Sequence, residues 1–261
     1  MARVVFVTAF LDLGEDRSQN KSVEICFNHF NSLARTGVQI QLFLSPCYKE
    51  AYDTICKHHS NVLVEYVELS QLQTFREIAD LEVRLPSSRT QYKDTRAFLT
   101  MMNAKAEIMH RAMGFEPGSS VSSNRYSWGA RHFAWIDFSI FHVIRDTENT
   151  IRYLADLAAA EFPSENCMMI PGCWPAPGTH AANLFDNINW RFCGGFFLAS
   201  VDSIFELNTL YRKHFRNIVV ERGLTWEVNL WALLENEYGW RPQWYKADHD
   251  DSIVRVPVPQ A

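Results

Sequence analysis

The first half of the chain alternates between short apolar runs and segments in which apolar residues recur every three or four positions. Residues 4–10, 38–45 and 61–69 are short runs rich in β-branched or aromatic side chains, which predict strands. Residues 20–35 place their apolar side chains on one helical stripe, and a second helix is expected around 48–56. Strands that alternate with helices in this way favour a parallel sheet.

The second half continues the alternation. Further strands are predicted at 132–143, 167–172, 190–200 and 240–251. Further helices are predicted at 96–113, 149–161, 201–217 and 225–237. Loops are expected at 84–96, 114–129 and 171–183. Because no repeat or long linker divides the sequence, we expect a single α/β domain over 1–261, with a mostly parallel central sheet flanked by helices.

The composition is that of a globular protein with a mild negative charge. Hydrophobic residues make up 47% of the 261 residues and charged residues 21%, which is enough to build a substantial core. The formal net charge is -5, and the sequence has no block of Lys and Arg of the kind that tracks a phosphate backbone. Long nucleic acid is therefore a poor candidate for a partner.

Cysteine usage and hydropathy indicate the compartment. The six cysteines lie mostly inside predicted strands and helices, so we expect them to be reduced and structural. The N-terminal apolar run ends in an acidic turn without a small-residue cleavage site, which indicates a first strand rather than a signal peptide. No apolar stretch approaches the ~20 residues that span a bilayer. We therefore expect a cytoplasmic protein without a transmembrane segment, which could work at the inner face of a membrane.

The run HFAWIDFSIFHV, residues 132–143, has the pattern of a buried strand with an aspartate inside it. Burial of a lone carboxylate costs several kcal/mol unless a partner, a proton or a metal ion compensates. One interpretation is that Asp137, toward the end of a central strand, holds a divalent cation that neutralises a bound phosphate group. The alternative is a carboxylate that caps a helix or pairs with an arginine such as Arg131.

Two further features of the second half could contribute to a binding site. His249 in KADHDD, residues 246–251, could complete an octahedral metal site with a flanking aspartate, phosphate oxygens and water. An acidic segment in this position can equally be a solvated loop. Gly194 and Gly195 interrupt the predicted strand at 190–200, which indicates a bulge or a close approach of another group to the backbone.

Two charged side chains fall on apolar helix faces. Lys105 lies inside the apolar stripe of 96–113, and Glu227 lies on or at the edge of the apolar face of 225–237. Lys105 is either a snorkelling lysine or a cation that points into a cleft. Glu227 is either a base or acceptor-orienting carboxylate, or an edge residue that reaches solvent or an interior arginine. Residue spacing leaves these alternatives open.

Several common catalytic motifs are absent from the sequence. It has no GxGxxG after the first strand, no GxxxxGKS or GxxxxGKT, no GxSxG and no HExxH. The cysteines and histidines between 167 and 193 also lack standard zinc spacing. Dehydrogenases, P-loop NTPases, serine hydrolases and zinc proteases are therefore disfavoured.

Six segments, in order along nearly the whole chain, resemble the HtrL/YibB family of bacterial and viral proteins. They are VTAFLDLG, SSRTQYKDTRAFLTMMNAKAEIMHRA, HFAWIDFSI, WRFCGGFF, TWEVNLWA and WYKADHDDSI. That family is similar to the GT-A glycosyltransferases, which hold a nucleotide-diphosphate sugar on a Rossmann-like sheet and usually bind Mn²⁺ or Mg²⁺. The resemblance implies a GT-A-like domain, with a nucleotide-sugar-binding half at 1–140 and an acceptor-binding and metal-completing half at 141–261.

The resemblance also implies roles for particular residues. Asp137 takes the place of the first acid of the DxD metal motif, but Ser139 stands where the second acid would be, so dependence on Mn²⁺ or Mg²⁺ is open. His249 matches the histidine that completes the metal site. Glu227 matches the catalytic or acceptor-binding acid, and Asp137 shares the catalytic role. The donor-binding residues implied are Arg89, Asn103, Lys105, Arg131, Gly194 and Gly195.

Together these features predict a glycosyltransferase that moves a sugar from a nucleotide-diphosphate sugar to a glycan, a lipid-linked or another hydroxyl acceptor. A divalent ion with Lys or Arg would relieve charge on the leaving group, and Glu227 would deprotonate the acceptor if the reaction inverts the anomeric centre. The alternative is a noncatalytic sugar- or nucleotide-binding protein of the same fold, which Ser139 favours. A nucleotidyltransferase ranks last, because no Gly-rich phosphate loop with a lysine follows the first strand.

Overall fold

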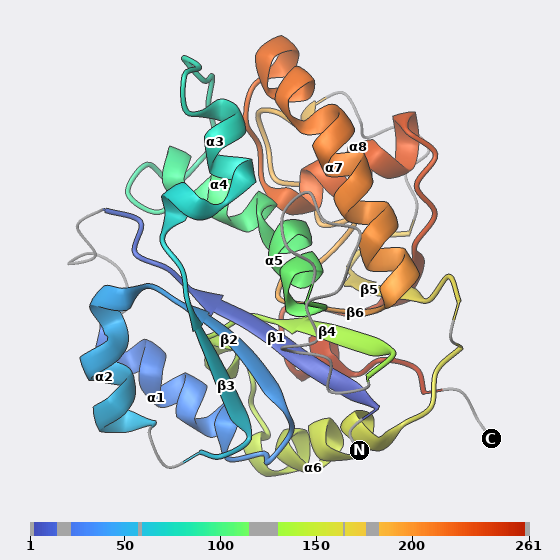
Figure 1. Ribbon diagram of the computed structural model, residues 1–261. Helices are drawn as coiled ribbons and strands as arrows, with labels where there is room; N and C mark the ends of the chain where they lie inside the picture. Colours follow the sequence, from blue (N-terminus) through green and yellow to red (C-terminus); the bar gives the residue numbers. More distant parts are fainter. Residues whose placement is uncertain are drawn as a thin grey trace.

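The computed structural model describes residues 3–14, 22–56, 59–114, 130–163, 165–175 and 183–258. A seven-stranded sheet lies at its centre, in the order β3-β2-β1-β4-β6-β5-β7 (Figure 1). The strands are β1 Val4–Phe10, β2 Ile40–Leu44, β3 Val62–Tyr66, β4 His132–Ile136, β5 Met168–Gly172, β6 Phe196–Ser200 and β7 Gln243–Lys246.

Helices cover both faces of the sheet (Figure 1). One face carries α1 Val23–Ala34, α2 Lys49–Ile55 and α6 Thr147–Ala159. The other face carries α3 Gln73–Ile78, α4 Arg96–Asn103, α5 Lys105–Ala112, α7 Val201–Arg222 and α8 Glu227–Glu237. None of the helices in the described ranges is long and apolar enough to cross a membrane. The layered arrangement confirms the predicted α/β fold.

Strand direction decides which loops meet. β3, β2, β1 and β4 run parallel, whereas β6 runs antiparallel to both β4 and β5. β5 and β7 are parallel to each other, so β6 is the one reversed strand of the described sheet. The sheet is therefore mostly parallel, as predicted. The carboxyl ends of β4, β5 and β7 lie at the same edge as the start of β6.

The continuous apolar run of β1 serves two cores, because successive side chains of a strand point to opposite faces. Val5 and Val7 belong to the core that also contains apolar residues of α5, α7 and α8. Val4 and Phe6 belong to the core on the side of α1 and α6. Full burial of a Val or Phe side chain contributes about 1.5–3 kcal/mol of transfer free energy. Burial on both faces explains why this strand shows no alternation of apolar and polar residues.

Two predicted helices differ in extent from those observed. The segment predicted as one helix at 96–113 forms α4 and α5, because the N–H of Ala104 bonds back to several carbonyls of α4 in a tightened last turn. The helix predicted at 201–217 continues as α7 to Arg222 and ends where Gly223 adopts a φ of 106°. The predicted loop at 114–129 falls almost wholly outside the described residues, as do parts of the predicted segments at 20–35 and 171–183.

Three predicted strands of the second half are much shorter than expected. β4 ends at Ile136, because the carbonyl of Asp137 accepts the N–H of Ile140 and the chain turns into a 3₁₀ helix. The prediction that one strand spans 132–143 is therefore wrong, and Asp137 follows the strand instead of lying inside it. β6 begins at 196, opposite the end of β4. Pro242, which has no N–H to donate, directly precedes β7.

His132 at the start of β4 makes stability depend on pH. Burial lowers the pKa of His132, although its hydrogen bond to the Pro163 carbonyl opposes this shift. The folded state therefore binds the proton less readily than the unfolded state, so the stability contribution is complete above the unfolded pKa of ~6.5 and is lost as pH falls through the lower folded pKa.

Urea unfolding at about pH 7.5 and about pH 5 should show a lower unfolding free energy at the acidic pH. The loss is expected to be smaller in His132→Asn than in the wild type. An equal loss in the two proteins would contradict the assignment to His132.

Candidate active site

A pocket of about 320 Å³ opens at the edge of the sheet where β4 ends. The residues predicted from the sequence that line it are Asp137, Gly194, Gly195, Glu227 and His249. The rest of the wall comes from the polar segment before α4, from α4 itself, from the 3₁₀ turn after β4, from residues 188–193 before β6, from Trp226 and Val228 at the start of α8, and from Ile253. The pocket thus gathers side chains that are far apart along the chain.

Strand direction explains this convergence. Asp137 directly follows β4, and Gly194 and Gly195 precede β6, which starts at the same edge because it runs the opposite way. His249 follows β7, which also ends at this edge. Glu227 is the first residue of α8 and comes from the helical layer. The N–H of Asp137 donates to the carbonyl of Gly195 over 2.9 Å, which ties the two turns together.

Lys105, the first residue of α5, lies beneath the pocket and joins two of its carboxylates, Asp137 and Glu227. Its Nζ lies 2.8 Å from Glu227 Oε1 and 3.1 Å from Asp137 Oδ1. The same ammonium donates to the carbonyl of Gly194 over 2.8 Å and lies 5.2 Å from the ring centre of Trp135. The side chain is only 1% exposed, so Lys105 does not snorkel to solvent. It is the buried counter-ion of both acids, and it does not line the pocket directly.

The charge of Lys105 is fixed by this environment. Burial by itself lowers the pKa of Lys105, but the charges and hydrogen bonds of Asp137 and Glu227 outweigh burial and raise the pKa above its ordinary value. The amine is therefore protonated at neutral pH. The two acids differ in exposure, at 36% for the side chain of Asp137 and 7% for that of Glu227. Asp137 presents its carboxylate openly, whereas Glu227 reaches the pocket from a nearly buried position.

Gly194 and Gly195 leave space for the ion-paired cluster of Lys105, Asp137 and Glu227. A Cβ on Gly194 would lie 2.0 Å from Glu227 Oε1 and 3.3 Å from Lys105 Nζ, atoms that are held in an ion pair. A Cβ on Gly195 would lie 3.0 Å from a terminal methyl group of Ile253, which can move. The paired glycines therefore mark a close approach of other groups to the backbone.

Gly194→Ala is expected to lower the unfolding free energy by about 1–3 kcal/mol, because the new methyl group displaces a buried, ion-paired carboxylate. Gly195→Ala should cost less, since flexible side-chain ends can yield. Urea unfolding of the two variants checks this order. Equal losses would contradict the proposed rigidity of the ion-paired cluster.

Asp137 and His249, the two residues predicted to bind a metal ion, line one pocket. No group of three or more His, Cys, Asp or Glu side chains within the described ranges is arranged to hold a metal ion. The cation beside Asp137 is the ammonium of Lys105, and the Oγ of Ser139 lies 2.6 Å from Nδ1 of His29. Lys105 thus engages one carboxylate oxygen of Asp137, and the metal-binding role of Asp137 and His249 stays a prediction. The residue set does not fit a protein-built Mn²⁺ or Mg²⁺ site.

His249 lies at the rim of the pocket among other rings. Its ring centre lies 5.9 Å from that of His142 and 6.2 Å from that of Trp190. Its backbone N–H donates to the carboxylate of the preceding Asp248 over 2.8 Å, in the turn that follows β7. This rim offers imidazole and indole groups to a ligand.

Asn103, predicted to bind the donor, is a buried structural residue. Its Nδ2 donates to the carbonyl of Thr225 over 2.8 Å, and its Oδ1 accepts from the hydroxyl of Tyr211 over 3.2 Å. These bonds fasten the end of α4 to α7 and to the segment before α8. Asn103 therefore supports the layer from which Glu227 projects, and it does not line the pocket.

Arg89 and Arg131 are also not among the residues that line the pocket. Arg89 donates to the carbonyl of Pro86 over 3.3 Å, within its own loop. Arg131 is exposed and precedes β4, whereas Asp137 follows this strand, so the two residues lie at opposite ends of it. The alternative pairing of Asp137 with Arg131 is thus wrong, because Lys105 takes that place.

The pocket also contains residues that were not singled out from the sequence. Lys93 and Asp94 line it from the polar segment that was predicted only as a loop at 84–96. Asp94 is buried and accepts the N–H of Thr90 over 3.0 Å, and Lys93 lies over the ring of Phe98 at 5.9 Å from its centre. The polar composition of residues 84–96 predicted only a loop, and the sequence has no spacing rule that links this segment to Asp137.

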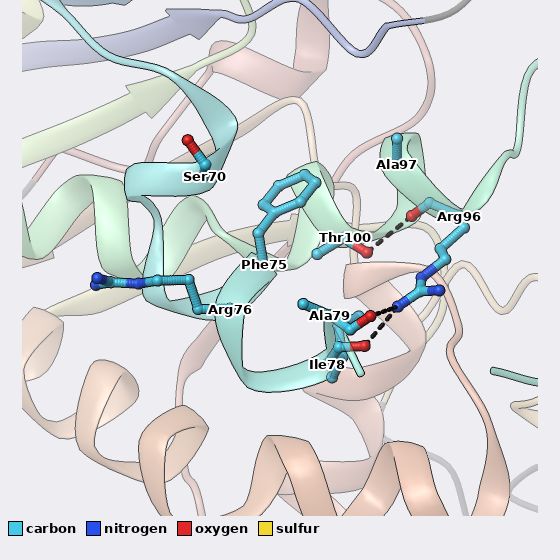
Figure 2. Close-up of a pocket in the computed structure, with 8 residues that line it drawn as sticks. All are labelled: Ser70, Phe75, Arg76, Ile78, Ala79, Arg96, Ala97 and Thr100. Atoms are coloured by element: carbon cyan, nitrogen blue, oxygen red, sulfur yellow. Dashed lines mark hydrogen bonds between the residues drawn. The ribbon is translucent and has the colours of Figure 1, made fainter. Parts of the chain in front are cut away.

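A second cavity of about 520 Å³ lies on the opposite face of α4 (Figure 2). The ring of Phe75 lies at its centre, and Arg96 donates to carbonyl groups at the end of α3, including that of Ile78. Phe98 and Met102 of the same helix face the pocket at β4 instead. The described lining of the second cavity includes no carboxylate, thiol or imidazole. We therefore assign the chemistry to the pocket at β4.

Comparisons with known proteins find distant structural likenesses. No family model and no curated protein matches the chain significantly. Mouse xyloside xylosyltransferase 1 is 8% identical over 95% of this chain and 85% of that chain, with a TM-score of 0.44. The 4-diphosphocytidyl-2C-methyl-D-erythritol synthase of Anaerococcus prevotii is 7% identical over 97% and 89%, with a TM-score of 0.46. Rv0371c of Mycobacterium tuberculosis H37Rv is 11% identical over 94% and 89%, with a TM-score of 0.43. Membership of the HtrL/YibB family therefore stays a prediction, and the question of activity rests on the geometry of the pocket.

Proposed function

We propose that this protein is a glycosyltransferase that moves a sugar from a nucleotide-diphosphate sugar to a hydroxyl acceptor in the pocket at the end of β4. The observation that carries the proposal is the pair of carboxylates, Asp137 and Glu227, that the buried Lys105 holds at one side of this pocket. The carboxyl edge of a parallel sheet is where α/β folds bind nucleotides. The resemblance of the WIDFS and CGGFF segments to GT-A glycosyltransferases supports the same assignment.

Glu227 is the general base in this proposal. Lys105 engages its Oε1 and orients the carboxylate, so that the second oxygen can accept the proton of an acceptor hydroxyl. The acceptor oxygen bonds to the anomeric carbon, and the bond from this carbon to the diphosphate breaks with its electron pair. Because the side chain of Glu227 is only 7% exposed, few water molecules compete for its carboxylate.

Asp137, Lys93 and His249 are the residues that would orient the donor. The more exposed carboxylate of Asp137 would accept hydrogen bonds from sugar hydroxyl groups. A bare carboxylate repels a diphosphate, so the negative charge of the donor needs a cation from elsewhere in the pocket. Lys93 lines the pocket and is assigned to the diphosphate as this cation, and His249 lines the pocket as a further hydrogen-bonding group.

The proposal also covers the acceptor of the sugar and the compartment in which the protein acts. The acceptor would be a glycan, a lipid-linked compound or another hydroxyl compound. The protein would act in the cytoplasm, and at the inner face of a membrane if the acceptor is lipid-linked. The halves 1–140 and 141–261 would supply the donor side and the acceptor side. Both halves contribute to the pocket, since Lys93 and Asp137 come from the first and Glu227 and His249 from the second.

A noncatalytic sugar- or nucleotide-binding protein is the second candidate function. Two observations favour it. Ser139 replaces the second acid of the DxD pattern, and Lys105 already neutralises Asp137. Such a protein would bind the donor in the same pocket without turning it over.

A thermal-shift panel tests donor binding. UDP-, GDP-, CDP- and dTDP-sugars, each with and without Mn²⁺, would be added to the wild type, to Asp137→Asn and to the control Asp156→Asn, which changes an exposed residue of α6. A ligand at a hundred times its dissociation constant stabilises the fold by about 2.7 kcal/mol. We expect a shift with one nucleotide that Asp137→Asn reduces and Asp156→Asn retains. No shift with any donor, or an undiminished shift in Asp137→Asn, would contradict the proposal.

A further inference from the structure

Cys173 and Cys193 form a thiol pair beside the pocket. Their sulfur atoms lie 3.8 Å apart, and both cysteines are free. Cys193 is buried and lines the pocket directly before the paired glycines, whereas Cys173 follows β5 and is partly exposed. Neither thiol has a role in the proposed transfer reaction.

Backbone hydrogen bonds hold the two segments side by side around this pair. The N–H of Cys193 donates to the carbonyl of Pro171 over 2.7 Å, and the N–H of Cys173 donates to the carbonyl of Trp190 over 3.0 Å. The main chain is therefore fixed on both sides of the thiols. Sulfur atoms in a disulfide lie about 2.05 Å apart, so rotation of the two side chains can bring them to bonding distance while these backbone bonds stay in place.

We propose that Cys173 and Cys193 form a reversible disulfide that locks the turn carrying Gly194 and Gly195 to the end of β5. The reduced pair, as the sequence predicts, is the resting state, and a small-molecule disulfide is the oxidant. The site is a redox modification site at the wall of the pocket. It stands whether or not the protein transfers sugar.

The disulfide would form in two steps of thiol–disulfide exchange. The thiolate of the more accessible Cys173 attacks one sulfur of a small-molecule disulfide, forms a mixed disulfide and releases one thiolate. Cys193 then loses its proton and attacks the sulfur of Cys173, which breaks the mixed disulfide and releases the second thiolate. Two protein thiols are oxidised, one small disulfide is reduced to two thiols, and no other reactant is needed.

The surroundings of the pair make the exchange slow at neutral pH. Burial raises the pKa of Cys173, and the nearby acids Asp248 and Asp250 raise it further, although the contact with Cys193 opposes them. Burial raises the pKa of Cys193 as well. The reactive thiolates are therefore more abundant at alkaline pH, which sets the conditions of the test.

The bond would act on the turn that holds the cluster together. Gly194 next to Cys193 accepts from Lys105, and Gly195 accepts from the N–H of Asp137. A cross-link at Cys193 fixes the first residue of this turn to a neighbouring strand. The amide groups between 193 and 196 should then open to solvent less often.

The test uses the full chain carrying Cys47→Ser, which removes an exposed thiol that could cross-link two molecules. The protein is incubated with oxidised glutathione at about pH 8.5, where the thiolate fraction is higher than at neutral pH although the pKa of each of the two thiols is raised. Free thiols are then alkylated, and peptides are mapped by mass spectrometry without reduction. We expect a linked peptide pair containing Cys173 and Cys193, reversed by dithiothreitol and absent in Cys173→Ser. Hydrogen exchange of the peptide that covers 190–200 should slow several-fold in the oxidised protein.

Glutathione that remains on Cys173 without a bond to Cys193 would overturn the proposed site. A bond that forms with unchanged hydrogen exchange would overturn the locking of the turn. Cys167→Ser, which changes a buried cysteine outside the pair, should still form the linked peptide and controls for general effects of cysteine loss.

Discussion

Release of nucleoside diphosphate from the donor sugar nucleotide is expected to fall by about 10²–10⁴-fold when Glu227 is replaced by glutamine. Glutamine keeps the shape of the side chain and can still accept from Lys105, but an amide does not take a proton at neutral pH. Because only the transfer step needs the base, the thermal shift that the donor produces should persist. Turnover at saturating donor and the thermal shift are measured on the same preparation.

Glu237→Gln is the matched control. Glu237 lies on the same helix and forms an exposed ion pair with Arg222 over 2.7 Å. Its replacement should leave turnover near the wild-type value. If Glu227→Gln also keeps full turnover, Glu227 is not the base.

Lys105→Met is expected to lower the unfolding free energy by about 3–5 kcal/mol. Methionine fills a similar volume, but it leaves Glu227 and Asp137 without their shared counter-ion and removes the donor to the carbonyl of Gly194. Two neighbouring carboxylates would then repel each other in a poorly solvated site. Urea unfolding measures the loss. The double variant Lys105→Met, Glu227→Gln should recover part of it, because it removes one of the unpaired charges.

Lys49→Met provides the comparison for an exposed ion pair. Lys49 pairs with Asp53 one helical turn away on α2, and its side chain is 60% exposed. Its loss should have little effect on the unfolding free energy, because water screens an exposed ion pair. If Lys105→Met costs as little as Lys49→Met, the buried cluster does not organise the pocket.

The central sheet could be predicted because its sequence signals are local. Each apolar run of the first half occurs where the structure has a strand, and the alternation with helices implies parallel pairing. The convergence of Asp137, Gly194 and Gly195 with Glu227 and His249 also agrees with the sequence argument. These residues follow or precede strands, or begin a helix, where an α/β sheet places its ligand site.

The partners of these residues could not be predicted, because they depend on how the layers are oriented. A stripe of apolar residues shows that Lys105 faces the sheet, but not that Asp137 and Glu227 meet it there. Asn103 lies two residues before Lys105, at the end of α4, and its side chain bonds to Tyr211 of α7 instead of facing the pocket. The predicted pairing of Arg131 with Asp137 failed for another reason. The five-residue strand β4 lies between them and places them at opposite ends of the strand.

The most direct test of the proposed function is the release of nucleoside diphosphate from UDP-, GDP-, CDP- and dTDP-sugars, with water as a slow acceptor and with hydroxyl compounds added in turn. Wild type, Asp137→Asn and Glu227→Gln are compared, each with and without Mn²⁺. A glycosyltransferase with this pocket should consume one donor, and both variants should lose most of that activity. A donor that binds in the thermal-shift panel and remains intact with every acceptor would contradict the glycosyltransferase and favour the noncatalytic binding protein.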